Sequence, residues 1–279
     1  MEKIIELKDV KKVYHMGNER IKAVDGVSFE INKGEFCCLL GTSGSGKSTL
    51  LNLMAGIEKA SSGKILLKGY DIRNMSEKNL ADFRQHYLGF VFQAYNLIGS
   101  MNALENVEMP LVFKRIDAKT RKKMAEQMLI QVGLGSRLTH KPKEMSGGQQ
   151  QRVGIARAFV ARPEIVFADE PTGNLDTKTT MEVMDIIHSM ARLNRQTIVM
   201  VTHDPRLASF GDKIIHILDG HIQNVEVMKT AEQIEEESLA EIEKFKQQQK
   251  EKKKARAEKL AKLMGKKTED THEEVKQDS

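Results

Sequence analysis

The stretch Gly41-Thr-Ser-Gly-Ser-Gly-Lys-Ser-Thr49 lies between an apolar run, 36–40, and a leucine-rich run, 50–54. It fits the pattern G-x-x-x-x-G-K-[ST] of a phosphate-binding loop, and it lies where that loop must lie, between a predicted strand and a predicted helix. Glycines let the backbone turn tightly, so that successive N–H groups can approach an anion. The helix that follows adds the positive end of its dipole. The stretch therefore predicts a site for nucleotide phosphates.

Two side chains of this loop predict the nature of the nucleotide. Lys47 is expected to reach the outer phosphates as a mobile charge, and the Ser48 hydroxyl is expected to join the oxygen ligands of Mg²⁺. The sequence therefore predicts a nucleoside triphosphate bound with Mg²⁺. The alternative is a glycine-rich turn that fits the pattern by chance. The loop residues expected to contact the nucleotide are Gly41, Thr42, Ser43, Gly44, Ser45, Gly46, Lys47, Ser48 and Thr49.

Length and composition allow one large α/β domain with an appendage. The chain has 279 residues, and 40% of them are hydrophobic, which suffices for a real core. No apolar run reaches about 18 residues, and the first residues lack the apolar core of a signal peptide, so we expect a soluble intracellular protein. The two cysteines, Cys37 and Cys38, are adjacent on a predicted buried strand. Because neighbouring strand residues face opposite sides, we interpret them as small core residues.

Two further apolar runs end in polar side chains. The run 88–92 leads to Gln93, and the run 165–168 leads to Asp169 and Glu170. Functional residues tend to emerge where parallel strands end. Asp169 is expected to hold Mg²⁺ through water, Glu170 to polarise the attacking water, and Gln93 to contact both a metal-bound water and the γ-phosphate. In isolation, Gln93 would more often be a capping or surface residue.

A second anion site is predicted at 146–149, Ser-Gly-Gly-Gln, directly before an amphipathic run. Serine followed by glycines is typical of a helix start whose free N–H groups can bind an anion. Two separate anion sites in one chain are hard to use on one nucleotide unless two copies of the chain pair. Farther along, the apolar run 197–202 leads to His203, which in isolation would more often be structural.

Together these motifs resemble those of the nucleotide-binding subunits of ATP-binding cassette (ABC) transporters, over about residues 2–228. The signature at 146–150 is the most specific feature, since few other ATPases have it at this distance before the paired carboxylates. The resemblance implies these roles: adenine stacking for Tyr14, the Walker A loop for 41–48, the Q-loop for Gln93, the signature for Ser146, Gly147, Gly148 and Gln149, Walker B and the catalytic base for Asp169 and Glu170, the D-loop for Asp176, and the switch histidine for His203.

The resemblance also implies an architecture. We expect an α/β fold of the P-loop NTPase (RecA-like) type, with an antiparallel β part, a helical subdomain at about 93–146, and a nucleotide-binding domain spanning 1–228. It implies a head-to-tail dimer in which ATP at Lys47 of one copy is covered by residues 146–148 of the other. The segment 229–279 is expected to be a charged extension, helical or partly disordered.

Within the family, the segments 90–93, 104–107 and 168–176 most resemble the lipoprotein-releasing and macrolide-export (LolD/MacB-like) ATPases that pair with FtsX-type permeases. This implies a subunit at the cytoplasmic face of the cell membrane that powers export or extraction of lipoprotein, peptide or drug. Residues 99–102, Gly-Ser-Met-Asn, depart from the proline and threonine common there. Since a γ-phosphate sensor must sit beside the element it moves, 93–110 is expected to form the permease groove, with Leu97 and Met101 in it.

Two alternative functions remain open. One is an FtsE-like regulatory ATPase that signals through an FtsX-type membrane protein without transport. The other is a soluble ABC protein that acts on ribosomes or DNA. That class usually has two cassettes or a long coiled-coil insertion, and this chain has neither, so no nucleic-acid partner is expected.

The C-terminal segment separates its charges. Residues 230–233 fit a helix-capping box, and Ile234, Leu239, Ile242 and Phe245 are predicted to share one helical face. Six acids and no bases lie in 232–243, whereas eleven bases and two acids lie in 244–267. Such a basic cluster predicts binding to the anionic inner surface of a membrane. The alternative is a solvated, partly frayed helix.

Overall fold

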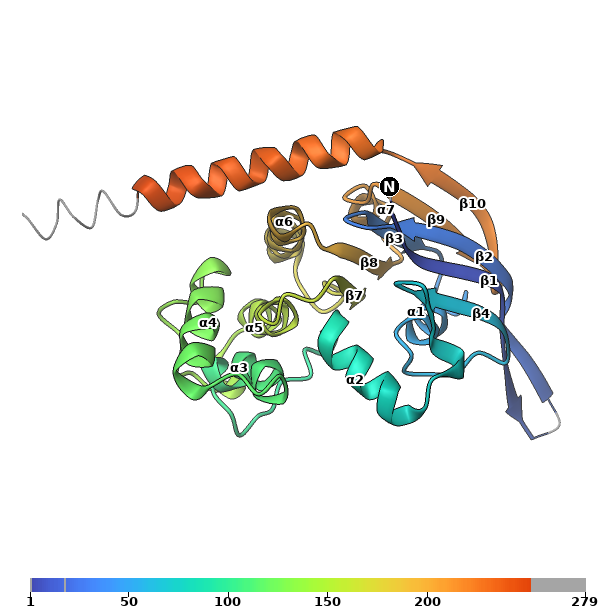
Figure 1. Ribbon diagram of the computed structural model, residues 1–279, viewed down its shortest axis with the longest axis horizontal. Coiled ribbons are helices and arrows are strands. Elements are labelled where there is room, and N and C mark those ends of the chain that lie inside the picture. The colour runs from blue at the N-terminus through green and yellow to red at the C-terminus, as the bar shows by residue number, and fades with distance from the viewer. Residues whose placement is uncertain (1, 18, 252–279) are drawn as a thin grey trace, which may run out of the picture.

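The structure is a computed structural model that describes residues 2–17 and 19–251. Its centre is a six-stranded sheet in the order β10-β9-β3-β8-β7-β6 (Figure 1). The strands are β3 (Phe36–Leu40), β6 (Leu88–Phe92), β7 (Ile165–Asp169), β8 (Thr197–Thr202), β9 (Lys213–Leu218) and β10 (His221–Val227). All pairs are parallel except β9 with β10, so five strands end at the same edge.

A second, antiparallel sheet has the order β2-β1-β4-β5. Its strands are β1 (Lys3–Met16), β2 (Glu19–Asn32), β4 (Ser62–Leu67) and β5 (Tyr70–Asp71). The two long strands pair from Lys3 opposite Asn32 to Met16 opposite Glu19. The short helix α1 (Lys47–Met54) contacts strands of both sheets.

The remaining helices are α2 (Glu77–Tyr87), α3 (Ala103–Phe113), α4 (Ala118–Gln131), α5 (Gly147–Phe159), α6 (Thr177–Asn194) and α7 (Pro205–Ala208), with 3-10 turns at Ile72–Asn74 and Pro142–Glu144. Most of them lie on the other face of the central sheet, whereas α2 packs with α1 in one hydrophobic cluster (Figure 1). The helices α3 and α4 are separate because Asp117 caps α4 and accepts the Thr120 N–H at 3.0 Å.

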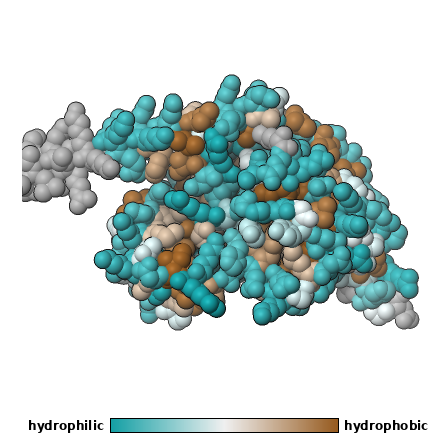
Figure 2. Space-filling view, viewed as in Figure 1, coloured by the Kyte–Doolittle hydropathy of each residue, from teal (hydrophilic) through white to brown (hydrophobic). Residues whose placement is uncertain are grey.

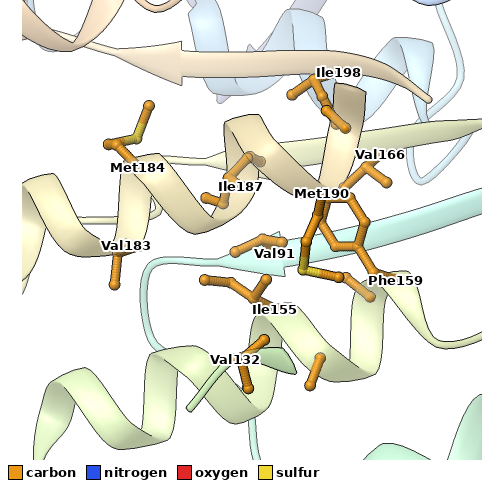
Figure 3. Packing of buried hydrophobic residues seen from close by; sticks show 14 of the residues in the cluster. Val91, Val132, Ile155, Phe159, Val166, Val183, Met184, Ile187, Met190 and Ile198 are labelled. Carbon is orange, nitrogen blue, oxygen red and sulfur yellow. The ribbon is translucent and has the colours of Figure 1, made fainter. Parts of the chain in front are cut away.

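Two hydrophobic clusters cover the two faces of the central sheet. One contains Cys38 and joins α3, α4, α5 and α6 to the sheet, and Figure 3 shows it around Ile155, Phe159 and Ile187. The other contains Cys37 and joins α1 and the antiparallel sheet to the opposite face. Both cysteines are free and buried, as expected for neighbouring strand residues that point to opposite faces.

The C-terminal helix, residues 231–251, crosses over α6 (Figure 1). Thr230 and Gln233 form the predicted capping interaction, with 2.8 Å from the Thr230 N–H to the Gln233 side-chain oxygen. Ile234 is buried, but Leu239 is 48% exposed, so the predicted apolar face is wrong at this position. Ser238 is buried in its place and donates its hydroxyl to the Ile234 carbonyl at 2.8 Å.

A buried ion pair anchors this helix to the body. Arg192 of α6 bonds to the fully buried Asp212 and also, at 3.1 Å, to Glu237 of the C-terminal helix. Lys229 bonds to the same Glu237 carboxylate. The outer side of the helix is mainly hydrophilic (Figure 2). In the described ranges, no helix combines the length and the apolar character needed to span a bilayer.

Candidate functional site

The phosphate-binding loop passes close to two neighbouring strands, and this explains its glycines. A Cβ on Gly41 would lie 2.1 Å from the Ile217 carbonyl oxygen of β9, and a Cβ on Gly46 would lie 2.2 Å from the Ala23 carbonyl oxygen of β2. Gly46 also has φ 95°, which favours glycine, and no side chain caps the helix α1 that it begins. The first N–H groups of α1 are therefore available to an anion.

The loop lysine lies against its own loop. The Nζ of Lys47 donates to the Thr42 carbonyl at 2.5 Å and to the Ser45 hydroxyl at 3.3 Å, and its side chain is 4% exposed. Burial lowers the pKa of Lys47, and the carboxylates of Asp169 and Glu170 partly oppose this shift. The tertiary structure thus brings the loop lysine near the two carboxylates that end β7.

The predicted metal ligands also come together. The Ser48 hydroxyl donates to Oδ1 of Asp169 at 3.0 Å, although 121 positions separate them in the chain. Burial raises the pKa of Asp169, and the hydrogen bond from Ser48 partly offsets this. Within the described residues, no cluster of three His, Cys, Asp or Glu could hold a metal alone. The oxygen donors here fit Mg²⁺, which takes one or two protein ligands and completes its shell with phosphate oxygens and water.

Glu170 and His203 form the next contact at this edge. The Nδ1 of His203 lies 3.2 Å from Oε1 of Glu170. Glu170 has φ 42°, an uncommon left-handed conformation, and its N–H bonds to the Val201 carbonyl of β8 at 3.1 Å. Both side chains line a cavity of about 570 Å³ together with Gly41, Thr42 and Ser43 of the phosphate-binding loop. A carboxylate beside a histidine in such a cavity can accept a proton from a nucleophilic water.

The second anion site lies in a separate cavity of about 420 Å³. Residues 146–149 and Asp176 line it, and none of the loop residues 41–49 does. Ser146 caps α5: its hydroxyl accepts the Gln149 N–H at 3.3 Å, and the Gln149 side chain accepts the Ser146 N–H at 3.1 Å. Asp176 caps α6 and accepts the Thr179 hydroxyl at 2.6 Å, which lowers the Asp176 pKa.

Two predicted site residues lie away from the catalytic contacts. The exposed Gln93 side chain packs on Gly173, where a Cβ would come within 2.7 Å of its Nε2. No hydrogen bond joins it to Ser48 or Asp169 in the described structure. The Tyr14 hydroxyl donates to Glu58 at 2.6 Å, and Tyr14 lies near Thr49 of α1, but it does not line the 570 Å³ cavity.

Two side chains of α5, which no sequence motif singled out, contact the functional segments. Gln151 is fully buried and donates to the Pro171 carbonyl, directly after Glu170. Arg157 donates to the carbonyls of Tyr95 and Asn96, just after Gln93, at 2.8 and 2.6 Å. The helix that begins at the second anion site is thus tied to both functional segments. For Gln151 a signal existed, because helical spacing places this polar side chain on the apolar face.

A parallel central sheet with a phosphate-binding loop after β3, and with carboxylates and a histidine at the ends of β7 and β8, defines a P-loop nucleoside triphosphatase. The chain belongs to the ABC transporter family, whose family model matches residues 24–173. It is therefore an ATP-binding subunit that hydrolyses ATP.

Similar proteins agree with this assignment. An uncharacterized ABC transporter ATP-binding protein of Thermotoga maritima is 45% identical over 226 residues, 81% of this chain and 96% of that protein. The macrolide export ATP-binding/permease protein MacB of Hyphomonas neptunium is 42% identical, over 78% of this chain and 34% of that protein. The solved cassette MJ0796, a dimer in a post-hydrolysis state bound to ADP and Pi, is 40% identical with a TM-score of 0.76, over 81% of this chain and 99% of that one.

Proposed function

We propose that this subunit powers an FtsX/MacB-type permease that exports or extracts a lipoprotein, peptide or drug. ATP would close two copies head to tail, and hydrolysis would reopen them and move the permease. The observation that carries the proposal is the separation of the two anion sites into two cavities, one around residues 41–43 and one around residues 146–149. The two cavities share no lining residue, which supports a pairing in which a two-fold axis brings the loop site of one copy to the second anion site of the other.

In this proposal each residue has a distinct role. Lys47 binds the outer phosphates, Glu170 polarises the attacking water, and His203 positions Glu170 through the 3.2 Å contact. Ser48 and Asp169 would hold Mg²⁺. Bound there, the ion would supply positive charge to offset that of the nucleotide's outer phosphates.

The proposed roles of the other residues depend on closure. Gln93 would sense the γ-phosphate after a change in the segment that follows it, where Tyr95 and Asn96 have left-handed backbone angles, φ 59° and 49°. Tyr14 would stack on adenine. Gly44, Gly46 and Thr49 would bind phosphates in one copy. In the other copy, residues 146–149 and Asp176 would cover the nucleotide.

A groove beside Gln93 is the proposed docking place for the permease. It measures about 410 Å³ and has apolar walls that include Phe90, Phe92, Met109 and Phe113. The sequence analysis placed Leu97 and Met101 in the permease groove, but neither residue lines the groove described here. Leu97 packs instead against the hydrophobic cluster of α3 to α6. A charge at Leu97 would damage folding as well as coupling.

We also propose that the subunit works at the cytoplasmic face of the membrane, held there by its permease and by the basic stretch 244–267. Most of this stretch, from residue 252 onward, lies outside the described residues. The sequence supports the proposal with eleven bases against two acids.

The proposal is tested by isolating the tagged chain from its native membranes in detergent. We expect one membrane protein to copurify, to resemble FtsX-type permeases, and to stimulate ATP hydrolysis. Deleting that protein should then abolish release of a transported substrate. If cell-wall hydrolase activation fails instead while no cargo is lost, the regulatory FtsE-like function is correct. If only ribosomes or nucleic acid copurify, the permease proposal is wrong.

A further inference from the structure

One hydrogen bond connects the helix of the second anion site to the loop that begins with Glu170. Gln151 lies in the second turn of α5, is fully buried, and donates its Nε2 to the Pro171 carbonyl. Over the ranges that the structure describes, no other hydrogen bond joins α5 to residues 170–175. A shift of α5 would therefore reach the residue after Glu170 through this bond.

Glu170 has a backbone conformation that depends on its surroundings. Its φ of 42° lies in the left-handed region, which residues other than glycine rarely occupy. Such a conformation persists where neighbouring contacts hold it. The Glu170 N–H donates to the Val201 carbonyl at 3.1 Å, and the Glu170 carbonyl accepts the Gly173 N–H at 3.0 Å. The bond from Gln151 holds the next carbonyl, that of Pro171, and so restrains the same turn.

The far end of this loop is also fixed. The Nδ2 of Asn174 donates to the Gln93 carbonyl at 3.0 Å. The loop 170–175 is thus tied at one point to α5 and at another to the segment of the proposed γ-phosphate sensor. Gln151 itself lines neither the cavity of Glu170 nor that of residues 146–149, so it can act only through the backbone that it holds.

We propose that Gln151 is a positioning residue for ATP hydrolysis. By holding the Pro171 carbonyl, it keeps the Glu170 carboxylate where it can accept a proton from the attacking water, and it makes that position depend on α5. The inference rests on the proposed function, because it takes Glu170 as the base and residues 146–149 as the part of α5 that meets the nucleotide of the other copy. Closure of two copies on ATP then sets α5 and, through Gln151, Glu170.

A second buried glutamine makes the same kind of contact at the opposite edge of the central sheet. Gln196 is 3% exposed and donates its Nε2 to the Pro163 carbonyl at 2.6 Å. In both Gln151 and Gln196, Oε1 is buried and has no hydrogen-bond partner among the described residues. Gln196 and Pro163 precede β8 and β7, whereas Glu170 and His203 follow these strands. The same substitution at the two glutamines should therefore have a similar structural cost, and only the one at Gln151 should affect the reaction.

The experiment replaces each glutamine with methionine, which has a similar length but no N–H donor. Gln151→Met should lower kcat about 10-fold or more and retain ATP affinity, because a small misplacement of a reacting group can slow a reaction by about 10²-fold. Gln196→Met should keep both the native kcat and the native ATP affinity. Thermal unfolding should show a similar loss of Tm in the two variants, which separates positioning from general destabilisation.

A second measurement separates closure from turnover. Gln151→Met leaves the residues of both anion sites unchanged, so ATP should still bring two copies together. Because hydrolysis is slowed, the dimer should accumulate on gel filtration in ATP with Mg²⁺, as expected for Glu170→Gln. The native protein and Gln196→Met should show less dimer at the same ATP concentration. A change that only loosened the fold would not increase the amount of dimer.

The possible failures have different meanings. If Gln151→Met hydrolyses ATP as fast as Gln196→Met, or if it loses ATP affinity together with kcat and forms no dimer, Gln151 does not position Glu170 and the inference is wrong. Either result leaves the proposed function intact. If Glu170→Gln itself hydrolyses ATP at the native rate, both the base assigned in the proposed function and this inference are wrong.

Discussion

The imidazole of His203 lies 3.2 Å from the carboxylate of Glu170, across the ends of the neighbouring strands β8 and β7. This contact joins the two residues in one cavity with the phosphate-binding loop. We propose Glu170 as the base and His203 as the residue that orients it, and the two roles have separable consequences.

Glu170→Gln should keep ATP binding and lower turnover by about 10²–10⁴-fold, because the amide keeps the shape of the side chain but cannot accept the proton. ATP should then hold two copies together, visible as a dimer on gel filtration. Phosphate release and ATP affinity are the measurements. Turnover equal to that of the native protein would show that Glu170 is not the base.

Lys47→Ala and His203→Ala should affect different steps, ATP binding in the first variant and hydrolysis in the second. Loss of the Lys47 ammonium removes a direct phosphate contact, so ATP affinity should fall. Loss of the His203 ring leaves the phosphate contacts intact, so hydrolysis should slow while affinity is retained. Titration of a fluorescent ATP analogue and steady-state hydrolysis separate the effects. The reverse pattern would contradict both assignments.

Mixing two inactive variants tests the head-to-tail arrangement. Lys47→Ala damages the loop site, and Gly148→Asp places a negative charge at the second anion site, where it repels phosphate. In a head-to-tail heterodimer one composite site contains both defects and the other is intact. We therefore expect mixtures to regain part of the ATPase activity that each variant lacks alone.

Gly148→Ala is the matched control for that mixture. A Cβ at this position would lie 2.5 Å from the Thr179 methyl group, so the alanine variant reports the steric cost without the charge. If mixtures of Lys47→Ala and Gly148→Asp stay inactive at concentrations where dimers form, each copy must complete its own site.

Asp169→Asn should stabilise the nucleotide-free subunit but weaken its stabilisation by Mg²⁺ with ATP. The pKa of Asp169 is raised above its ordinary value of 3.8, so the folded protein holds this proton more tightly than the unfolded chain. Stability from this group is therefore lost as pH rises from about 3.8 through the folded pKa. Replacing the carboxylate should stabilise the free subunit more at pH 8 than near pH 4, as measured by thermal unfolding.

The same variant should lose stabilisation by Mg²⁺ with ATP, because the amide is a weaker ligand for Mg²⁺ than the carboxylate. In a domain of this size, each kcal/mol by which Mg²⁺ and ATP stabilise the folded protein should raise its Tm by about 2–4 °C. An equal effect of the substitution on thermal unfolding at pH 8 and near pH 4 would contradict a raised pKa of Asp169.

The C-terminal bases should bind anionic vesicles. A chain that ends at Glu251 keeps the anchored helix and removes eight of the eleven bases in 244–267. Each base near an anionic surface contributes about 1 kcal/mol. The full chain should therefore sediment with anionic but not neutral vesicles, less so at high salt, and the shortened chain should remain in solution. Equal sedimentation of both chains would exclude the proposed membrane contact.

Much of the site follows from the order of residues along the chain. The loop 41–49 has fixed spacing because one strand, one turn and one helix must form it together. The carboxylates at 169 and 170 and the histidine at 203 follow apolar runs, and parallel strands end at one edge. For these residues, local pattern and general topology suffice to predict that they meet.

In the C-terminal helix, the spacing of apolar residues alone did not predict which side chains face the body. Leu239 fits an apolar face only loosely, and in the structure it points outward while Ser238 faces the body. The choice depends on where Arg192 meets Glu237, which fixes the rotation of the helix on α6. The spacing of apolar residues along the sequence does not specify that rotation.

The sequence by itself determined the nucleotide site, the parallel sheet and the family, because each depends on contacts between neighbours in the chain or on strand ends that any parallel sheet brings together. Only the tertiary structure showed that the backbones of β9 and β2 leave no room for a side chain at Gly41 or Gly46. It also showed that Arg157 holds the segment after Gln93, and that no carboxylate of the described chain pairs with the charge of Arg157. These features depend on distances between segments far apart in sequence, and packing of the whole core sets those distances.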